Sequence, residues 1–360
     1  MDNSLLVFEK YCKSDATKRM YQYHFDRFLR YCKKGEPLIT ADGLLTLKNV
    51  VLQTWIEDYV YGLRNKISPN SYSGVVASLQ LFFSMNDIVL NWDKIHRLIP
   101  SSVAKSGKEA WTNNDIKKML DSTTSLRNKA IIHLLASTGC RIGAISELRI
   151  KHLSNMAEGC MAVLLYADSK EEYYSYITPE AVSSLNAYLD QRKKNGEYFD
   201  EDSFVFREEY KLGIQKPKML KYDAVSYTLY RIVRKIERKK GRGGRYNVQM
   251  AHGLRKRFAS ILKTNKDIPY SVGERLLGHQ IYLDPSYFVA SKESLFNFWK
   301  RVISDLTIDD SERERLRRIE VEQKVTELET EKDAKLAKLE SENKEMKESI
   351  KGLWELMKKD

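Results

Sequence analysis

Apolar residues in the first hundred positions recur at the spacing of amphipathic helices, three and four apart. Two such sets are Tyr21, Phe25, Phe28 and Leu29, and Val75, Leu79, Phe82 and Phe83. The pattern predicts an all-α bundle of about four helices. The polar segment from Ser101 to Ala110 offers little to bury and predicts a linker. We therefore expect a first domain over residues 1–104.

The pattern then changes from helical spacing to alternation. In MAVLLYADSKEEYYSYIT the alternation predicts a hairpin, with strands around 162–166 and 173–177 and a turn at 168–171. Helical patterns precede the hairpin and resume at Pro179. We expect a second domain over 105–308 that is mainly α with a small β-sheet.

The last fifty residues are rich in Glu, Lys, Arg and Leu and contain no Pro. Apolar positions alternate three and four apart through Leu336, Leu339, Asn343, Met346, Ile350, Leu353 and Met357, and an earlier piece contains Val321, Val325 and Leu328. This is the a/d seam of a coiled coil, and a polar Asn in the seam fixes register. We expect a self-associating coiled-coil tail over 309–360, and a solvated single helix is the alternative.

Charge narrows the choice of partner. The chain has 61 Lys and Arg against 49 Asp and Glu, and its net charge is +12. After position 308 there are 13 basic and 16 acidic residues, which leaves a net charge of +15 on the first 308 residues. A surface this basic favours a polyanion, with nucleic acid ahead of an anionic membrane.

The same composition excludes other classes. No stretch approaches the roughly 18 apolar residues of a membrane span, and the N-terminus lacks a signal-peptide layout, so we expect a cytoplasmic protein without membrane contact. Four separated cysteines, with no Cys/His cluster, predict reduced thiols and no metal site.

Several residues suited to phosphate chemistry follow one another in the second domain. Arg141 follows a Thr-Gly turn in ASTGCRIGAISEL, and AHGLRKRFAS places His252 and Arg255 three apart. His279 ends ERLLGH, and Tyr287 comes eight residues later. Guanidinium groups donate in a fork that matches phosphate oxygens, so two Arg and two His can neutralise a phosphodiester without an ion. Each motif alone is weak, because a surface His-Arg pair or an Arg after a helix end is common.

Together with Lys170 in the hairpin turn, this order resembles the catalytic domain of tyrosine recombinases, the lambda integrase and Xer superfamily. The resemblance covers roughly residues 5–300, and its N-terminal part is similar to their core-binding domain. It implies that Arg141 and Arg255 clamp the scissile phosphate while His252 and His279 donate hydrogen bonds or move protons. Tyr287 would form a 3′-phosphotyrosyl intermediate, and Lys170 would protonate the leaving 5′ oxygen.

The resemblance also implies a site-specific integrase or excisionase that needs no metal, cofactor or ATP. Its partners would be double-stranded DNA and further copies of the chain, as a tetramer on DNA. A Xer-like resolvase, a type IB topoisomerase and a noncatalytic DNA-binding protein of the same fold are the alternatives. The run LDPSYF before the tail is most similar to integrases of archaeal mobile elements. One chain does not reveal the DNA sequence that it would recognise.

The chain departs from the family pattern near the predicted site. An acidic residue commonly follows the first Arg by three positions, but here that position is Ala144, and Glu147 comes three later. The interval from His279 to Tyr287 is one residue shorter than is common. Tyr282 is a competing candidate for the nucleophile. Because it lies only three residues from His279, it would be too close to reach the same phosphate from the other side, so we favour Tyr287.

Basic residues outside this set predict contacts with DNA phosphates. They are Lys18, Arg19 and Arg27 in the first domain, and Arg234, Arg238, Lys239, Lys240, Arg242 and Arg245 in the second. A solvated charge run is the alternative for the second group.

Overall fold

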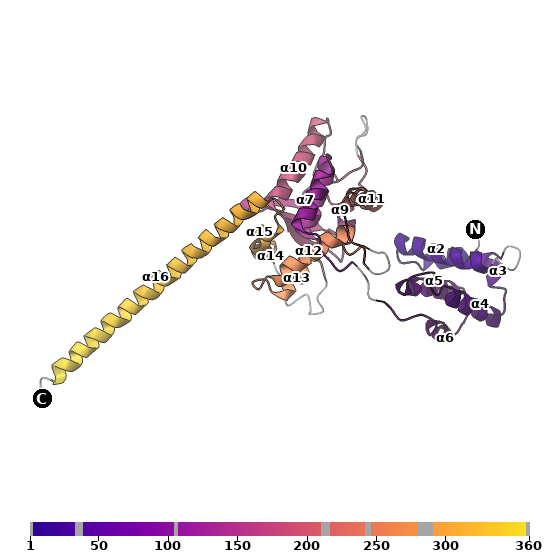
Figure 1. Cartoon of the computed structure of the whole chain (residues 1–360), viewed down its shortest axis with the longest axis horizontal. Helices are drawn as coiled ribbons and strands as arrows, with labels where there is room; N and C mark the ends of the chain where they lie inside the picture. The colour runs from indigo at the N-terminus through magenta and orange to yellow at the C-terminus, as the bar shows by residue number, and fades with distance from the viewer. Residues whose placement is uncertain are drawn as a thin grey trace. The chain divides into compact units, whose positions relative to one another are not determined.

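The computed structural model describes residues 3–32, 39–103, 107–209, 217–241, 246–279 and 291–357. The chain forms two compact units, residues 1–105 and 106–360 (Figure 1). The tail after residue 309 is part of the second unit. No described helix is long and apolar enough to cross a membrane.

The first unit is entirely helical in its described part. Its helices are α1 (Asn3–Lys10), α2 (Asp15–Cys32), α3 (Ala41–Leu44), α4 (Asn49–Gly62), α5 (Tyr72–Met85) and α6 (Trp92–His96). Phe25 and Phe28 of α2 pack with Phe82 and Phe83 of α5, so the apolar faces predicted from spacing do form the core. The bundle contains more helices than the expected four, because α1, α3 and α6 are too short to show a helical period.

The second unit surrounds one small sheet with helices. Before and within the sheet lie α7 (Asn113–Asp121), α8 (Leu126–Thr138), α9 (Gly143–Glu147), β1 (Leu153–Asn155), β2 (Met161–Leu165) and β3 (Tyr173–Ile177). After it come α10 (Pro179–Lys194), α11 (Tyr222–Val233), α12 (Met250–Thr264), α13 (Tyr270–Leu276), α14 (Lys292–Trp299), α15 (Ile303–Leu306) and α16 (Asp310–Met357). The expected fold class, mainly α with a small sheet, is confirmed.

The sheet is antiparallel in the order β1-β2-β3. Val163 pairs with Ser175 on one side and Leu153 on the other, which confirms the predicted hairpin and adds a third strand. Residues 166–172 connect β2 to β3, with Tyr166 and Asp168 in the left-handed region. The hairpin packs on α8, which also contacts α10 and α12.

One buried arginine fixes the helix that carries His252 and Arg255. Arg257 of α12 donates to Asn113 Oδ1 (2.7 and 2.9 Å) and to the carbonyl oxygens of Asp305 (2.8 Å) and Leu306 (3.1 Å). The guanidinium thus joins α12 to the start of α7 and to the segment before the tail. A buried charge must find such partners, since leaving it unpaired is costly.

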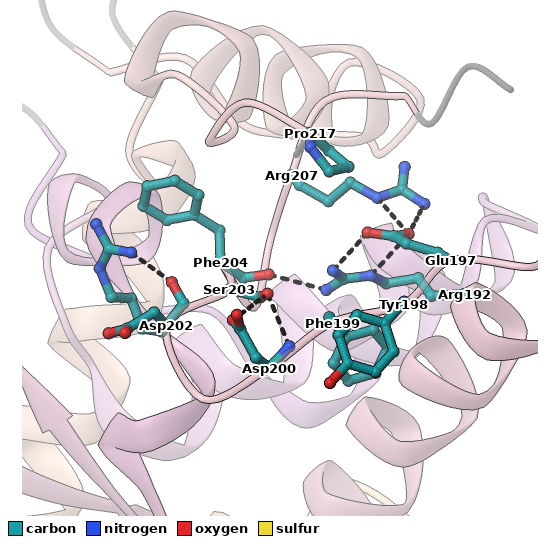
Figure 2. A pocket seen from close by; sticks show the side chains of 11 residues that line it. Arg192, Glu197, Tyr198, Phe199, Asp200, Asp202, Ser203, Phe204, Arg207 and Pro217 are labelled. Atoms are coloured by element: carbon teal, nitrogen blue, oxygen red, sulfur yellow. Dashed lines mark hydrogen bonds and ion pairs between the residues drawn. The ribbon is translucent and has the colours of Figure 1, made fainter. Parts of the chain in front are cut away.

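Helices α10 and α13 both end in a Schellman motif. In a Schellman motif, the residue after the left-handed glycine donates its N–H to a carbonyl five residues earlier. After α10, Glu197 N–H donates to the Arg192 carbonyl (3.1 Å) behind Gly196 (φ +80°). The two side chains also pair, since Glu197 accepts from Arg192 (2.7 and 3.1 Å). Figure 2 shows this pair beside Arg207, which binds the same carboxylate.

The pocket in Figure 2 has a volume of about 220 Å³ and contains none of the predicted catalytic residues. Its charged groups satisfy one another: Arg192 also donates to the carbonyl oxygens of Phe204 and Val205, both at 2.9 Å. Burial would raise the pKa of Glu197, but the hydrogen bonds from Arg192 and Arg207 hold it below its usual range. The network therefore anchors the chain after α10 and belongs to the fold.

Candidate active site

Arg255 lies where three segments of the second unit meet. The residue is 8% exposed; Nη1 donates to the carbonyl oxygen of Gly139 (2.8 Å) and Nη2 to that of Leu277 (2.6 Å). Gly139 ends α8 two residues before Arg141, and Leu277 ends α13 two residues before His279. Arg255 therefore brings together three motifs that lie far apart in the sequence.

His279 contacts Arg255 directly. Arg255 Nη2 lies 2.9 Å from His279 Nε2, and an arginine can only donate. Nε2 therefore accepts, and the proton of the neutral ring is on Nδ1, which lies 2.6 Å from Glu274 Oε2. The ring is partly exposed and held on both sides, so its tautomer follows from its partners.

Arg141 lies on the surface beside the hairpin turn. Its Nη1 is 3.7 Å from Glu171 Oε2, and both side chains are exposed. Lys170, the neighbour of Glu171, is exposed as well. The contact places the 166–172 turn next to Arg141. A site that contains both Arg141 and Lys170 requires this proximity.

His252 shares a face of α12 with Arg255, one turn earlier, because α12 is helical as the spacing required. It lies at the surface, and its pKa is lowered by partial desolvation of the ring and by the positive charges of Lys256 and Arg255. A neutral ring near physiological pH can accept a proton or donate one, depending on its tautomer.

Two glycines permit this close packing. Gly139 and Gly278 both have positive φ, +57° and +64°. A Cβ on Gly139 would lie 2.6 Å from the Phe258 ring, and one on Gly278 would lie 2.3 Å from the Tyr173 ring. Glycine is therefore required at both turns by backbone conformation and by space.

Tyr173 and Cys140 lie close to Arg255. Burial raises the pKa of the Tyr173 phenol above its usual range and that of the Cys140 thiol to about 11. Both groups therefore stay neutral near physiological pH.

Tyr287 and Tyr282 lie outside the described residues, as do Arg242 and Arg245 of the predicted DNA-binding set. The structure thus brings together Arg255, His279 and the turn before Arg141, with His252 on the same helix as Arg255. Within the described ranges, no group of three His, Cys, Asp or Glu side chains could hold a metal ion.

The chain is similar to known recombinases and integrases. Residues 109–282 match the profile of the phage integrase family. The matched segment is slightly less than half of the chain, and the match supports a tyrosine recombinase. Tyrosine recombinase XerA of Pyrococcus horikoshii is 26% identical over 269 residues, which cover 74% of this chain and 80% of that protein. Tyrosine recombinase XerC of Leptospira interrogans is 25% identical over 312 residues, covering 83% and 90%.

One solved structure supports the fold. The crystal structure of a lambda integrase tetramer bound to a Holliday junction matches with a TM-score of 0.51 and 16% identity. The match covers 79% of this chain and 75% of that one.

Sequence reasoning missed one residue of the cluster. Glu274 is buried and touches His279, whereas Ala144 is buried without a carboxylate and Glu147 is exposed. The segment GERLLGH contained a usable signal. Gly278 is a glycine of the kind that ends a helix, and such an end brings the next residue, His279, close to the residue five positions earlier, Glu274.

Proposed function

We propose that this site-specific DNA recombinase uses Tyr287 as its nucleophile. The observation that carries the proposal is the convergence around Arg255, which hydrogen-bonds to the segments that lead into Arg141 and His279. A cluster of donors with an exposed side fits a phosphate group held at the surface of DNA. Tyr287 follows His279 by eight residues, within reach of such a phosphate.

In the proposed reaction the phenolic oxygen of Tyr287 attacks phosphorus as its proton passes to the neutral ring of His252 or His279, and the bond to the 5′ oxygen breaks. The 5′ oxygen takes a proton from Lys170 and leaves as a hydroxyl. Arg141 and Arg255 stabilise the charge on the nonbridging oxygens, which is greatest in the transition state. The product is a 3′-phosphotyrosyl bond, and a 5′ hydroxyl from another strand reverses the attack. The bond energy is conserved, so resealing needs no ATP.

Basic residues of the first unit form one proposed DNA contact. Arg27, Arg30 and Lys66 line a hollow of about 290 Å³ with Tyr31 and Tyr59. Arg19 is exposed, whereas Lys18 forms an ion pair with Glu9 (2.6 Å) and would have to exchange that partner for a phosphate. Since the hollow combines positive charge with aromatic edges, it suits a backbone phosphate and its sugar.

The second proposed contact lies after α11. Arg234, Lys239 and Lys240 are exposed, while Arg238 stacks over the Tyr246 ring at 3.7 Å. Lys240 and Tyr246 pair as an antiparallel bridge, which holds the basic segment in place. Phosphate contacts of this kind position a protein on DNA without reading sequence.

The tail supports self-association. α16 is one continuous helix of 48 residues, and its seam residues Val321 (62%), Leu339 (56%) and Ile350 (51%) are exposed. An apolar stripe of that length in water favours pairing with a second helix. We propose that another copy of α16 covers it, within a tetramer on DNA. The tail and the run LDPSYF favour an integrase of an archaeal mobile element that acts in the cytoplasm.

A nicked suicide substrate tests the nucleophile. Cleavage releases a short strand from such DNA, so the covalent adduct accumulates and runs slowly on a denaturing gel. We expect adducts with the wild type and with Tyr282→Phe, and none with Tyr287→Phe at unchanged DNA affinity. An adduct with Tyr287→Phe would reject Tyr287 as nucleophile.

A further inference from the structure

Glu274 is a buried carboxylate attached to the candidate active site. Its side chain is 11% exposed. One oxygen lies 2.6 Å from His279 Nδ1, and the other lies 2.8 Å from Lys263 Nζ. Contacts therefore run without a gap from Lys263 through Glu274 and His279 to Arg255.

The end of α13 explains why these two side chains meet. Gly278 N–H donates to the Arg275 carbonyl (2.8 Å) and His279 N–H to the Glu274 carbonyl (2.9 Å). This is the Schellman motif seen after α10, where the equivalent positions are Arg192 and Glu197. In both places the motif brings residues five apart into side-chain contact, usually made by apolar groups. After α13 this contact is polar, and it joins Glu274 to His279 of the candidate active site.

The carboxylate remains ionised in this environment. Burial would raise the pKa of Glu274, but hydrogen bonds from Lys263 and His279 outweigh burial and lower it. The groups that face it are Lys263 from α12 and His279 from the turn, and Arg255 lies on the far side of the imidazole. A fixed negative charge next to Nδ1 compensates positive charge on the ring.

We propose that Glu274 is a positioning residue that holds His279 with its Nε2 next to Arg255, where the scissile phosphate would bind. This inference rests on the proposed function. Glu274 keeps the proton on Nδ1 while the ring is neutral, and it stabilises the imidazolium when Nε2 gains a proton and donates to a phosphate oxygen. Among the described carboxylates near the cluster, Glu171 pairs with Arg141 at the surface and Glu147 is exposed, so neither performs this task.

A double-mutant cycle separates positioning from general support of the fold. Glu274→Gln keeps the shape and removes the charge, and we expect single-turnover cleavage to slow about tenfold to a hundredfold, as when a partner that orients a ligand histidine is lost. DNA affinity should stay unchanged. In a His279→Ala background the same substitution should add nothing, because its effect acts through the ring. Glu147→Gln, an exposed glutamate of the same unit, is the matched control and should cleave normally.

The outcomes distinguish this inference from the proposed function. If His279→Ala slows cleavage but Glu274→Gln does not, or if the two effects multiply, Glu274 does not act through His279. If no adduct forms at Tyr287, the proposed function itself fails.

A measurement on the wild type avoids any folding defect of the variants. In protein with ¹⁵N-labelled histidine, long-range ¹H–¹⁵N spectra distinguish the two neutral tautomers of the six rings. His279 is assigned by the signal lost in His279→Ala. We expect the Nδ1–H form for His279. The Nε2–H form would overturn the proposal.

Discussion

Alanine at Gly278 tests the close packing behind His279. The substitution places an L side chain at φ +64°, which costs about 1–2 kcal/mol. It also places a Cβ 2.3 Å from the Tyr173 ring, so the turn or the ring must move. Overpacking of this kind typically costs about 1–3 kcal/mol more. We expect a total loss of about 2–5 kcal/mol in the free energy of unfolding, together with slower cleavage because His279 follows directly.

Gly196 offers a matched control. It occupies the same position of the same motif at φ +80°, but its added Cβ would have nothing within 4 Å. Gly196→Ala should therefore lose only the backbone cost of about 1–2 kcal/mol. Urea unfolding of both variants measures the difference, which is the clash alone. In a Tyr173→Leu background the excess should disappear. Equal losses for the two glycines would refute the close approach of β3 to the turn.

Three further predictions concern charge, pH and the tail. Arg141→Ala should slow cleavage by about a hundredfold, as when one transition-state donor is lost, with a much smaller change in DNA affinity; equal losses in both would make Arg141 only an anchor. His133 Nδ1 is buried without a described partner, and burial lowers the pKa of this ring to about 4 from 6.5. Between these two pKa values the His133 ring is protonated in the unfolded chain but neutral in the folded one. The free energy of unfolding therefore falls as the pH drops, by about 2 kcal/mol between about pH 7.5 and about pH 5. Urea unfolding of His133→Leu should lack this component, and an unchanged pH slope would contradict it. Truncation after Glu320 should preserve cleavage of one site but reduce particle mass in light scattering and weaken two-site recombination; equal mass and recombination would leave α16 as a solvated helix.

The truncation point comes from the structure. A cut at Asp309 follows from composition, but the first turns of α16 belong to the folded unit. Leu316 is buried, and Arg317 pairs with Asp305 at 3.0 Å. Glu180 accepts from the N–H groups of Ile308 (2.6 Å) and Asp309 (3.0 Å). These contacts are invisible in a heptad pattern, because they join residues distant in sequence.

Local patterns predicted the elements that carry their own period. The hairpin was predicted within one residue of β2 and matches β3, and α12 has the expected helical face with His252 and Arg255. β1 is three residues long, too short to alternate visibly. Residue order and family resemblance gave the candidate set, whereas its geometry depends on carbonyl groups of Gly139 and Leu277, which no side-chain pattern reveals.

Glu274 shows the same limit within the site. The expected acidic position, Ala144, has no carboxylate, and a search for the nearest replacement in sequence leads to Glu147, which is exposed. The buried carboxylate lies on another helix, 130 positions from Ala144 in numbering, and reaches the ring through a helix-ending motif. A substitution in one segment can be compensated only where the fold brings another segment close.

Peptide mapping of the trapped adduct identifies the residue to which DNA becomes attached, which we expect to be Tyr287. Trypsin cuts after Arg275 and Lys292, so one peptide contains both Tyr282 and Tyr287. After nuclease trimming of the trapped adduct, fragmentation of this peptide in a mass spectrometer locates the remaining nucleotide. We expect the nucleotide mass on Tyr287. Its presence on Tyr282, or on any residue outside this peptide, would contradict the account.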